Sequence, residues 1–264
     1  MKILYVGDVM GEVGLRVVER VVPKLRRQKQ IDLVIAQAEN TSEGKGITLA
    51  DFKRLREAGV DFCSGGNWSL HRAEIIQAMN DPAQPIIRPA NYPKGTPGLG
   101  WKYIEYLTSK VLIISLLGHI VGKDADKSID NPLRVIDALL EQEKDTVRTA
   151  TIVNFHGDYS SEKVVIGHYL DGRVTAVVGD HWHVPTADAR VLPGGTAHVT
   201  DVGMCGALDA SLGVQFSSVI PRWRDGKQTR NVLETAGQRQ FNAVLVETTK
   251  DGLARSIEQI QETF

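Results

Sequence analysis

Five short, nearly continuous apolar segments recur along the chain, and each one leads to a polar residue. They are Lys2 to Val6, Asp32 to Ala36, Val60 to Cys63, Thr149 to Phe155 and Val174 to Val178. Segments of this kind are typical of central strands of a parallel sheet that helices cover on both sides. The first is followed by Val13 to Gln28, where apolar residues stand at helical spacing. This alternation predicts an α/β fold.

Local signals predict the remaining helices. Thr48 with Asp51 forms a variant capping box for a helix through Ala58, and Asn131 with Pro132 begins a helix that runs through Leu140. Two further helices are expected at Arg72 to Met79 and at Ser160 to Leu170.

Alternating and turn-flanked segments predict antiparallel pairs late in the chain and at one edge of the sheet. The edge pair is Tyr103 to Leu107 with Lys110 to Leu117. The late hairpins are Arg190 to Leu192 with Thr196 to Thr200, and Asn242 to Thr248 with Leu253 to Ile257. We expect these hairpins to form a second, antiparallel sheet that packs on the first.

Composition narrows the class of protein. A chain of 264 residues with 42% hydrophobic residues can bury a sizeable core, and we expect one domain over residues 1–264. A net charge of −1 gives no reason to expect a nucleic-acid or membrane surface, so the partner is expected to be a small molecule. The cluster Arg222, Arg224, Lys227 and Arg230 is read as a solvated face, with a phosphate or partner contact as the alternative.

The cysteines and apolar runs favour a cytoplasmic protein. Cys63 and Cys205 form neither a disulfide framework nor a metal knuckle, which fits a reducing compartment and predicts buried, inert thiols. The N-terminal apolar stretch is too short for a signal peptide, and Val111 to Val121 is too short to span a bilayer.

The polar residues at the ends of these strands are of the types that can bind metal ions. Because ligands of open α/β sheets bind beyond the carboxyl ends of the strands, we expect these side chains to meet at one place. They are Asp8, Glu39, Asn40, Asn67, His156, His181 and His183. In an extended chain His181 and His183 project from the same side and can serve one metal centre.

Each of these residues has a simpler interpretation. Asp8 and Asn67 could cap helices, Asn40 could be a turn residue, and His156 could be a core histidine. Glu39 is harder to explain in this way, because a carboxylate at the end of a buried strand is costly unless it is paired or bound to metal.

Two metal ions about 4 Å apart can activate a shared hydroxide and stabilise both oxygens of an in-line phosphoryl displacement. Glu39 is the best placed bridging carboxylate. Asp8, Asn40 and one histidine of the pair would complete one site, while Asn67, His156 and the other histidine would complete the second. Oxygen and imidazole donors favour Fe or Mn, and Zn stays open.

Several sequence blocks together resemble the calcineurin-like metallophosphoesterases, and most closely their bacterial YmdB-like branch. The blocks include Gly7-Asp8, Glu39-Asn40, Gly66-Asn67, Asn154-Phe155-His156, Ser161-Glu162-Lys163, Gly179 to His183, Arg88 to Pro93 and Thr200 to Met204. The resemblance covers nearly the whole chain and is weak only from about 206 to 241.

The resemblance implies a four-layer α/β/β/α sandwich and a binuclear site of iron that often accepts manganese. It implies hydrolysis of 2′,3′-cyclic nucleotides to 3′-nucleotides. It assigns Asp8, Glu39, Asn40 and His183 to the first metal, and Glu39, Asn67, His156 and His181 to the second.

Three positions depart from the family pattern. Members usually have a proton-donating histidine where this chain has Trp68, whose indole does not titrate. His71 could take over as the acid if the following turn is helical, or it could simply lie at the surface. Relatives usually carry aspartate at Asn154, so an orienting group there would be neutral. Trp182 could pack or offer a face to a nucleobase.

The expected function is that of a metal-dependent phosphodiesterase with Glu39 and His71 as its catalytic residues. Two alternatives stay open. One is a metal-bearing nucleotide-binding or regulatory protein with little turnover because of Trp68, and the other is a phosphomonoesterase of the same fold. The oligomeric state is also open.

Overall fold

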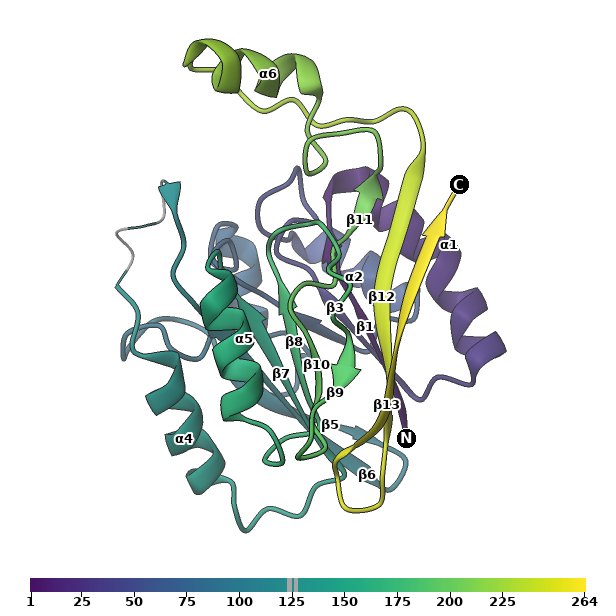
Figure 1. The fold of residues 1–264 in the computed structure, drawn as a ribbon, viewed down its shortest axis with the longest axis vertical. Coiled ribbons are helices and arrows are strands. Elements are labelled where there is room, and N and C mark those ends of the chain that lie inside the picture. Colours follow the sequence, from purple (N-terminus) through teal and green to yellow (C-terminus); the bar gives the residue numbers. More distant parts are fainter. Residues whose placement is uncertain (123–124, 126–127) are drawn as a thin grey trace.

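Two β-sheets pack face to face, and helices cover the outer face of each (Figure 1). This arrangement comes from a computed structural model that describes residues 1–122, 125 and 128–264. The expected four-layer α/β/β/α sandwich is confirmed.

The first sheet contains the N-terminal strands and the C-terminal hairpin. Its order is β2-β11-β12-β1-β3-β4, with β13 paired to β12. The strands are β1 (Lys2–Val6), β2 (Asp8–Val9), β3 (Leu33–Gln37), β4 (Phe62–Ser64), β11 (Met204–Ala207), β12 (Arg239–Thr248) and β13 (Ala254–Thr263). β1, β3 and β4 are parallel, whereas β12 runs antiparallel to β1. Helices α1 (Gly11–Lys29) and α2 (Leu49–Glu57) cover its outer face.

The second sheet is built from the middle of the chain. Its order is β5-β6-β7-β8-β10-β9. The strands are β5 (Trp101–Tyr106), β6 (Ser109–Leu117), β7 (Ala150–His156), β8 (Ala176–Asp180), β9 (Arg190–Val191) and β10 (Ala197–Val199). β6, β7, β8 and β10 are parallel, and the antiparallel β5 forms the predicted edge pair with β6. Helices α4 (Pro132–Gln142) and α5 (Ser160–Tyr169) cover this sheet.

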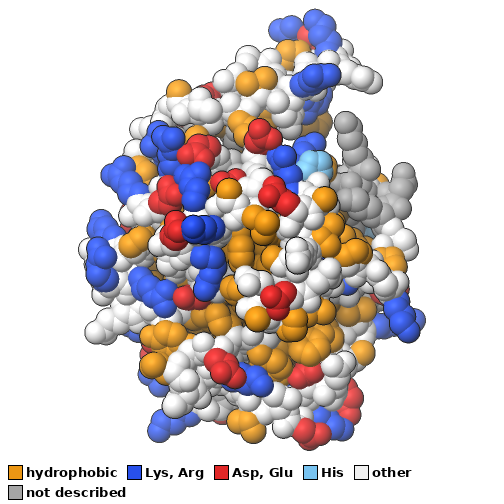
Figure 2. All heavy atoms as spheres, turned by 180° about the vertical axis from the view of Figure 1, so that it is seen from behind, with side chains coloured by type: hydrophobic (Ala, Val, Ile, Leu, Met, Phe, Trp, Pro, Cys, Tyr) orange, Lys and Arg blue, Asp and Glu red, His pale blue; other side chains and the backbone are white. Residues whose placement is uncertain are grey.

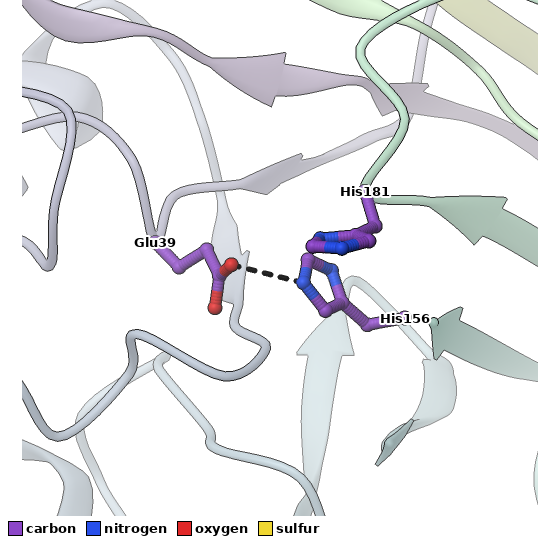
Figure 3. Close-up of side chains that lie close together, drawn as sticks. All are labelled: Glu39, His156 and His181. Atoms are coloured by element: carbon purple, nitrogen blue, oxygen red, sulfur yellow. Dashed lines mark ion pairs between the residues drawn. The ribbon is translucent and has the colours of Figure 1, made fainter. Parts of the chain in front are cut away.

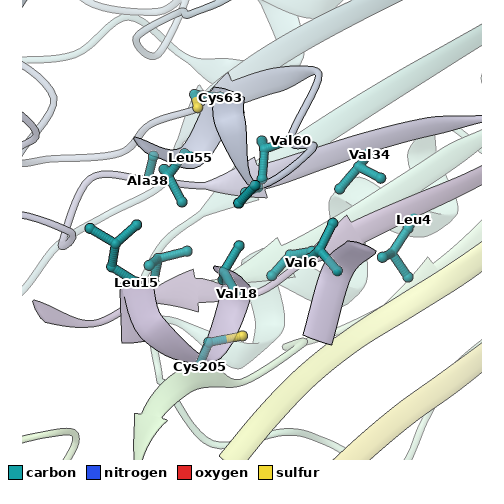
Figure 4. Packing of buried hydrophobic residues seen from close by; sticks show 14 of the residues in the cluster. Leu4, Val6, Leu15, Val18, Val34, Ala38, Leu55, Val60, Cys63 and Cys205 are labelled. Carbon is teal, nitrogen blue, oxygen red and sulfur yellow. The ribbon is translucent and has the colours of Figure 1, made fainter. Parts of the chain in front are cut away.

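Three apolar cores separate the four layers. Leu4 and Val34 of the first sheet pack against Leu15 and Val18 of α1 and Leu55 of α2 (Figure 4). The middle core joins the two sheets, and its members include Tyr5, Ile35, Phe62, Ile113, Ile152 and Val178. A third core lies between the second sheet and helices α4 and α5. Alternate residues of one strand thus serve different cores, because side chains alternate across a strand.

The structure corrects the predicted distribution of strands. The five apolar segments do not share one parallel sheet, since three belong to the first sheet and two to the second. The late hairpins pair as predicted, but they do not form a separate sheet. The hairpin of β9 and β10 extends the second sheet, and that of β12 and β13 extends the first. The pattern of apolar residues predicts where the strands are, but it does not predict which strands pair with one another.

The predicted helix starts are largely confirmed. Asn131 accepts hydrogen bonds from the backbone N–H groups of Leu133 and Arg134, with Pro132 in the first turn. Thr48 caps α2 by accepting from the N–H of Asp51, but the Asp51 carboxylate accepts from Ser42 Oγ instead of reaching back to Thr48.

The segment expected as one helix from Arg72 is divided. It consists of a 3₁₀ turn, Ala73–Ile75, and the short helix α3 (Ile76–Asn80). Residues 206–241, for which the sequence pattern predicted no helix or strand, contain helix α6 (Phe216–Asp225). This helix projects from the body of the molecule (Figure 1).

The surface mixes both signs of charge. Figure 2 shows Lys and Arg side chains interspersed with Asp and Glu side chains over the face opposite to that of Figure 1. In the basic cluster, Arg222 is bonded to Thr229 and Asn231, while Arg224 and Lys227 pair with Asp225. Among the described helices, none is both long and apolar enough to cross a membrane.

Candidate metal centre

The carboxyl ends of parallel strands from both sheets meet at one edge of the sandwich. Asp8 begins β2, and Glu39 and Asn40 follow β3. Asn67 follows β4, and His156 ends β7, while His181 and His183 follow β8. All of these side chains are buried except that of His181, which is about one fifth exposed. The structure therefore brings together all seven residues that the sequence singled out as ligands.

Glu39, His156 and His181 point toward one another from three different elements (Figure 3). Their potential ligand atoms all lie within 4.8 Å of one another. Glu39 Oε1 is 3.0 Å from His156 Nε2, and Asn67 Oδ1 is 2.8 Å from the same nitrogen. These four residues form the first of two groups, which we call the Glu39 group.

Asp8, Asn40 and His183 form the second group, which we call the Asp8 group. The side-chain amide of Asn40 lies 3.2 Å from Asp8 Oδ1 and 3.3 Å from His183 Nε2. His183 Nε2 is 3.6 Å from Asp8 Oδ1. The backbone N–H of His181 donates to Asp8 Oδ2 at 3.2 Å, which ties the two groups together.

A metal ion fits this donor set. Glu39 Oε2 accepts the backbone N–H of Trp68 at 2.8 Å, whereas the buried Oε1 has no hydrogen bond among the described residues. Its 3.0 Å contact with His156 Nε2 is an ion pair when that imidazole is protonated. A buried carboxylate oxygen is costly unless a positive charge lies beside it, and either a protonated imidazole or a metal ion supplies that charge. Carboxylate, amide and imidazole donors are the ligands that divalent metal ions use in such sites.

The electrostatics show carboxylates and imidazoles held together. Burial raises the pKa of Asp8, but the charges of His183 and His156 lower it by a larger amount. The pKa of Asp8 therefore lies well below its usual value. Burial lowers the pKa of His156, yet Glu39 and Asp180 raise it well above the ordinary histidine value. The pKa of His183 is also raised, because Asp8 outweighs the effect of burial. The carboxylates at this edge therefore favour positive charge on the two imidazoles, and a metal ion is another way to supply it.

Asp180 organises the floor of the site. Its Oδ1 lies 2.7 Å from His156 Nδ1, and its Oδ2 accepts from Tyr5, Gln37 and Asn154 at 3.0, 3.0 and 2.5 Å. A carboxylate on Nδ1 fixes the tautomer so that Nε2 can act as a ligand. The prediction of a neutral orienting group at Asn154 is therefore wrong, since Asn154 bonds to Asp180 and the carboxylate itself orients His156.

The two histidines after β8 are not extended. His181 has φ 101° and His183 has φ 62°, so both lie in a region of backbone space that non-glycine residues rarely adopt. The predicted convergence on one site is observed, but two strained turns produce it instead of strand alternation. His183 Nδ1 lies 3.3 Å from the carbonyl oxygen of Leu212, which directs Nε2 toward Asp8. Strain of this kind persists where the surrounding structure fixes it, often at functional sites.

A buried lysine supports the same loop. Lys163 Nζ donates to the backbone oxygen of Asp180 and to Asp201 Oδ2, both at 2.6 Å. It also lies 4.1 Å from the ring centroid of Trp182. The Trp182 indole N–H donates to the backbone oxygen of Asp158 at 3.0 Å, so this tryptophan packs within the loop.

The glycine before Asn67 is required by close packing. A Cβ atom at Gly66 would lie 2.4 Å from the His156 ring. Only glycine lets the loop after β4 bring Asn67 next to His156.

Trp68 and His71 lie in contact beside the Glu39 group. The backbone N–H of His71 donates to the backbone carbonyl oxygen of Trp68 at 2.9 Å. The two side-chain rings meet edge to face, with their centroids 5.2 Å apart. The turn thus places both residues on one side, as the spacing predicts, and His71 is exposed.

Comparisons with known proteins agree with this site. A sequence model of the YmdB-like protein family matches residues 4–260. The chain is 38% identical to the 2′,3′-cyclic-nucleotide 2′-phosphodiesterase of Bacillus subtilis (strain 168) over 231 residues, 87% of this chain and 85% of that protein. Its structure superposes on a hypothetical protein from Thermus thermophilus with a TM-score of 0.90 and 36% identity, covering 100% and 99% of the two chains.

A second solved structure, a phosphatase from Mycoplasma pneumoniae, gives a TM-score of 0.91 at 30% identity, covering 100% of this chain and 93% of that one. Two packed sheets with candidate metal ligands at their common edge are the arrangement of the metallophosphoesterases, and this chain has that fold. Within that class, the chain belongs to the YmdB-like family.

Several residues of the site did not stand out in the sequence. Asp180, Gln37 and Asp158 each contact a candidate ligand or its support, and Asp158 Oδ1 lies 3.3 Å from His181 Nε2. Asp180 stands directly before the histidine pair and Gln37 ends β3, so their position at strand ends is the signal that could have found them. The carbonyl of Leu212 had no signal, because any residue could supply it.

Proposed function

We propose that the chain hydrolyses small phosphodiesters at a binuclear metal centre, and that its substrates are 2′,3′-cyclic nucleotides, which it converts to 3′-nucleotides. The observation that carries this proposal is the buried Oε1 of Glu39, which accepts no hydrogen bond among the described residues and lies in a set of potential ligand atoms, with those of His156 and His181, that are all within 4.8 Å of one another. The activity named for the Bacillus subtilis relative supports the choice of substrate.

In this proposal Asp8, Asn40 and His183 hold one metal ion, and Asn67, His156 and His181 hold the other. Glu39 belongs to both sets. We propose iron, with manganese as the alternative, because the set contains oxygen and imidazole donors without thiolate. The ligands come from both sheets, so residues 1–264 would act as one domain.

When bound, the metal pair supplies Lewis acidity for activating the nucleophile and for stabilising charge on the phosphate. The chain itself supplies orientation. Asp180 holds the His156 ring, and Trp68 holds Glu39 through its backbone N–H. The Trp68 indole cannot give a proton to the leaving oxygen, so we assign that role to His71, whose ring lies against Trp68.

Chromatographic product analysis tests this function. Manganese-loaded protein should convert 2′,3′-cyclic AMP to 3′-AMP, and metal-stripped protein should not. His71→Gln should reduce turnover about 10²-fold or more, as expected for a general acid. His168→Gln, which changes an exposed histidine of α5, is the matched control. Unchanged substrate from a demonstrably metal-loaded sample would contradict the proposal.

Trp68 favours one second candidate, a nucleotide-binding or regulatory protein with little turnover. Trp68→His separates the two. A rise in kcat by orders of magnitude in this variant would show that the parent chain lacks an acid. A parent that is already fast would exclude this candidate.

The phosphomonoesterase alternative draws support from the Mycoplasma pneumoniae phosphatase structure. It is tested by comparing 2′,3′-cyclic AMP with 3′-AMP as substrates. In our proposal 3′-AMP accumulates and is not consumed.

A further inference from the structure

A cavity of about 520 Å³ lies directly beside the candidate metal centre. Its described lining consists of Asn67, Trp68, Leu70, His71, Tyr92, Pro93 and Ser128. Asn67 belongs both to this lining and to the Glu39 group, so a ligand could occupy the cavity and reach the metal centre at the same time. The volume lies in the range of small-molecule sites.

Trp68 forms a fixed aromatic wall of the cavity. Its backbone N–H is bonded to Glu39, its ring meets the edge of His71, and Lys45 Nζ lies 4.4 Å from its ring centroid. These contacts set the position of the indole relative to the candidate metal ligands.

The loop from Arg88 to Gly100 supplies Tyr92 and Pro93, the other apolar part of the lining. Arg88 is buried, and its guanidinium donates to the carbonyl oxygens of Pro89, Thr96 and Pro97 within this loop. The Asn91 side chain donates to Leu117 O and accepts from Leu117 N–H, which docks the loop on β6. Tyr92 Oη lies 3.5 Å from Gly66 O, close to Asn67.

The chemistry of the lining selects the kind of ligand. The described lining residues are mostly aromatic, apolar or amide side chains with one imidazole, and Lys45 Nζ lies against the Trp68 ring. Anionic groups need cations or clustered N–H donors, whereas flat, largely neutral rings bind between aromatic and apolar side chains. A nucleobase meets this requirement, and its phosphate would lie toward Asn67.

We propose that this cavity binds the nucleobase of the substrate, with Trp68 and Tyr92 as its stacking surfaces. The proposal rests on the function proposed above, since it presumes a nucleotide substrate. It also gives the departure at position 68 a role, because the indole that replaces a proton donor adds a surface for base recognition.

The test compares two ligands that share a phosphate and differ in the base. Isothermal titration calorimetry measures 3′-AMP and ribose 3-phosphate binding to manganese-loaded wild type, Trp68→Leu and Tyr92→Leu. Loss of one stacking contact should weaken 3′-AMP binding about 10-fold or more. Ribose 3-phosphate should bind equally to all three proteins.

Two further variants keep the result interpretable. Trp68→Phe retains a stacking ring and should recover most of the 3′-AMP affinity. Trp223→Leu, which changes a side chain on α6 that is 85% exposed, should bind both ligands as wild type does. Equal loss of both ligands in Trp68→Leu, or full 3′-AMP affinity in both leucine variants, would overturn the proposal.

Failure of the substrate assignment would look different. Trp68-dependent binding of 3′-AMP by a protein that does not hydrolyse 2′,3′-cyclic AMP would refute the proposed reaction and keep the base site. Hydrolysis with a KM unchanged in both leucine variants would keep the reaction and refute the base site.

Discussion

Asn154 Nδ2 donates to Asp180 Oδ2 at 2.5 Å, so the two neighbouring strands β7 and β8 present one amide and one carboxylate to the floor of the candidate metal centre. The carboxylate is the member that reaches His156. We therefore expect Asp180→Asn to weaken metal binding about 10- to 100-fold, as loss of a ligand-orienting carboxylate generally does. Competition with a chelator measures this, and unchanged affinity would show that Asp180 has no orienting role.

Replacing the side-chain amide of Asn154 should lower the stability of the fold. Asn154→Asp would place a second buried carboxylate against Asp180 and remove the donated hydrogen bond, lowering the free energy of unfolding by about 3 kcal/mol. The double variant Asn154→Asp, Asp180→Asn keeps one carboxylate in the network and should recover much of that loss. Urea unfolding of the three proteins gives the comparison. A double variant no more stable than Asn154→Asp alone would refute the like-charge explanation.

Lys163 should be a strong contributor to stability. Lys163→Met removes the cation from the buried Asp201 and from the Asp180 carbonyl, and should cost about 3 kcal/mol, because a buried partner loses its opposite charge. Lys53→Met, which removes an exposed lysine paired with Glu57 at 3.7 Å, should change stability by less than about 0.5 kcal/mol. Adding Asp201→Asn to Lys163→Met should recover part of the loss. Similar stability of the two lysine variants would contradict this account.

Metal uptake should depend on pH in a defined direction. In the metal-free protein the pKa values of His156 and His183 are raised, so these imidazoles keep their protons to higher pH than ordinary histidines. A metal ion must displace those protons, so uptake should release protons and apparent affinity should increase as pH rises from about 5 to about 8. Titration in two buffers of different ionisation enthalpy measures the protons released. Affinity that falls with pH over this range would refute the assignment of these histidines as ligands.

The sequence predicted which residues meet, and less of how they meet. The meeting of Asp8, Glu39 and His156 could be predicted because each follows or ends an apolar strand. A polar side chain buried at such a position is costly without a partner. The pattern of apolar and polar residues could not predict how the strands divide between the two sheets, since a buried strand has the same composition in either sheet. The family resemblance implied the sandwich, which the structure confirms.

The finer geometry depends on contacts between residues far apart in the chain. The positive φ angles of His181 and His183 follow from the loop after β8 and its contacts with Leu212 and Asp8, which no local pattern encodes. Asp180 did not stand out in the sequence, and the four hydrogen-bond partners of its carboxylate come from three other strands.

The central claim is that one edge of the sandwich holds two metal ions with Glu39 between them. Anomalous diffraction from crystals of the manganese-loaded protein tests it most directly. We predict two anomalous peaks, one within ligand distance of Asp8, Asn40 and His183, and one within ligand distance of Asn67, His156 and His181, both in contact with the Glu39 carboxylate. A single peak, or peaks bound by other side chains, would contradict the account.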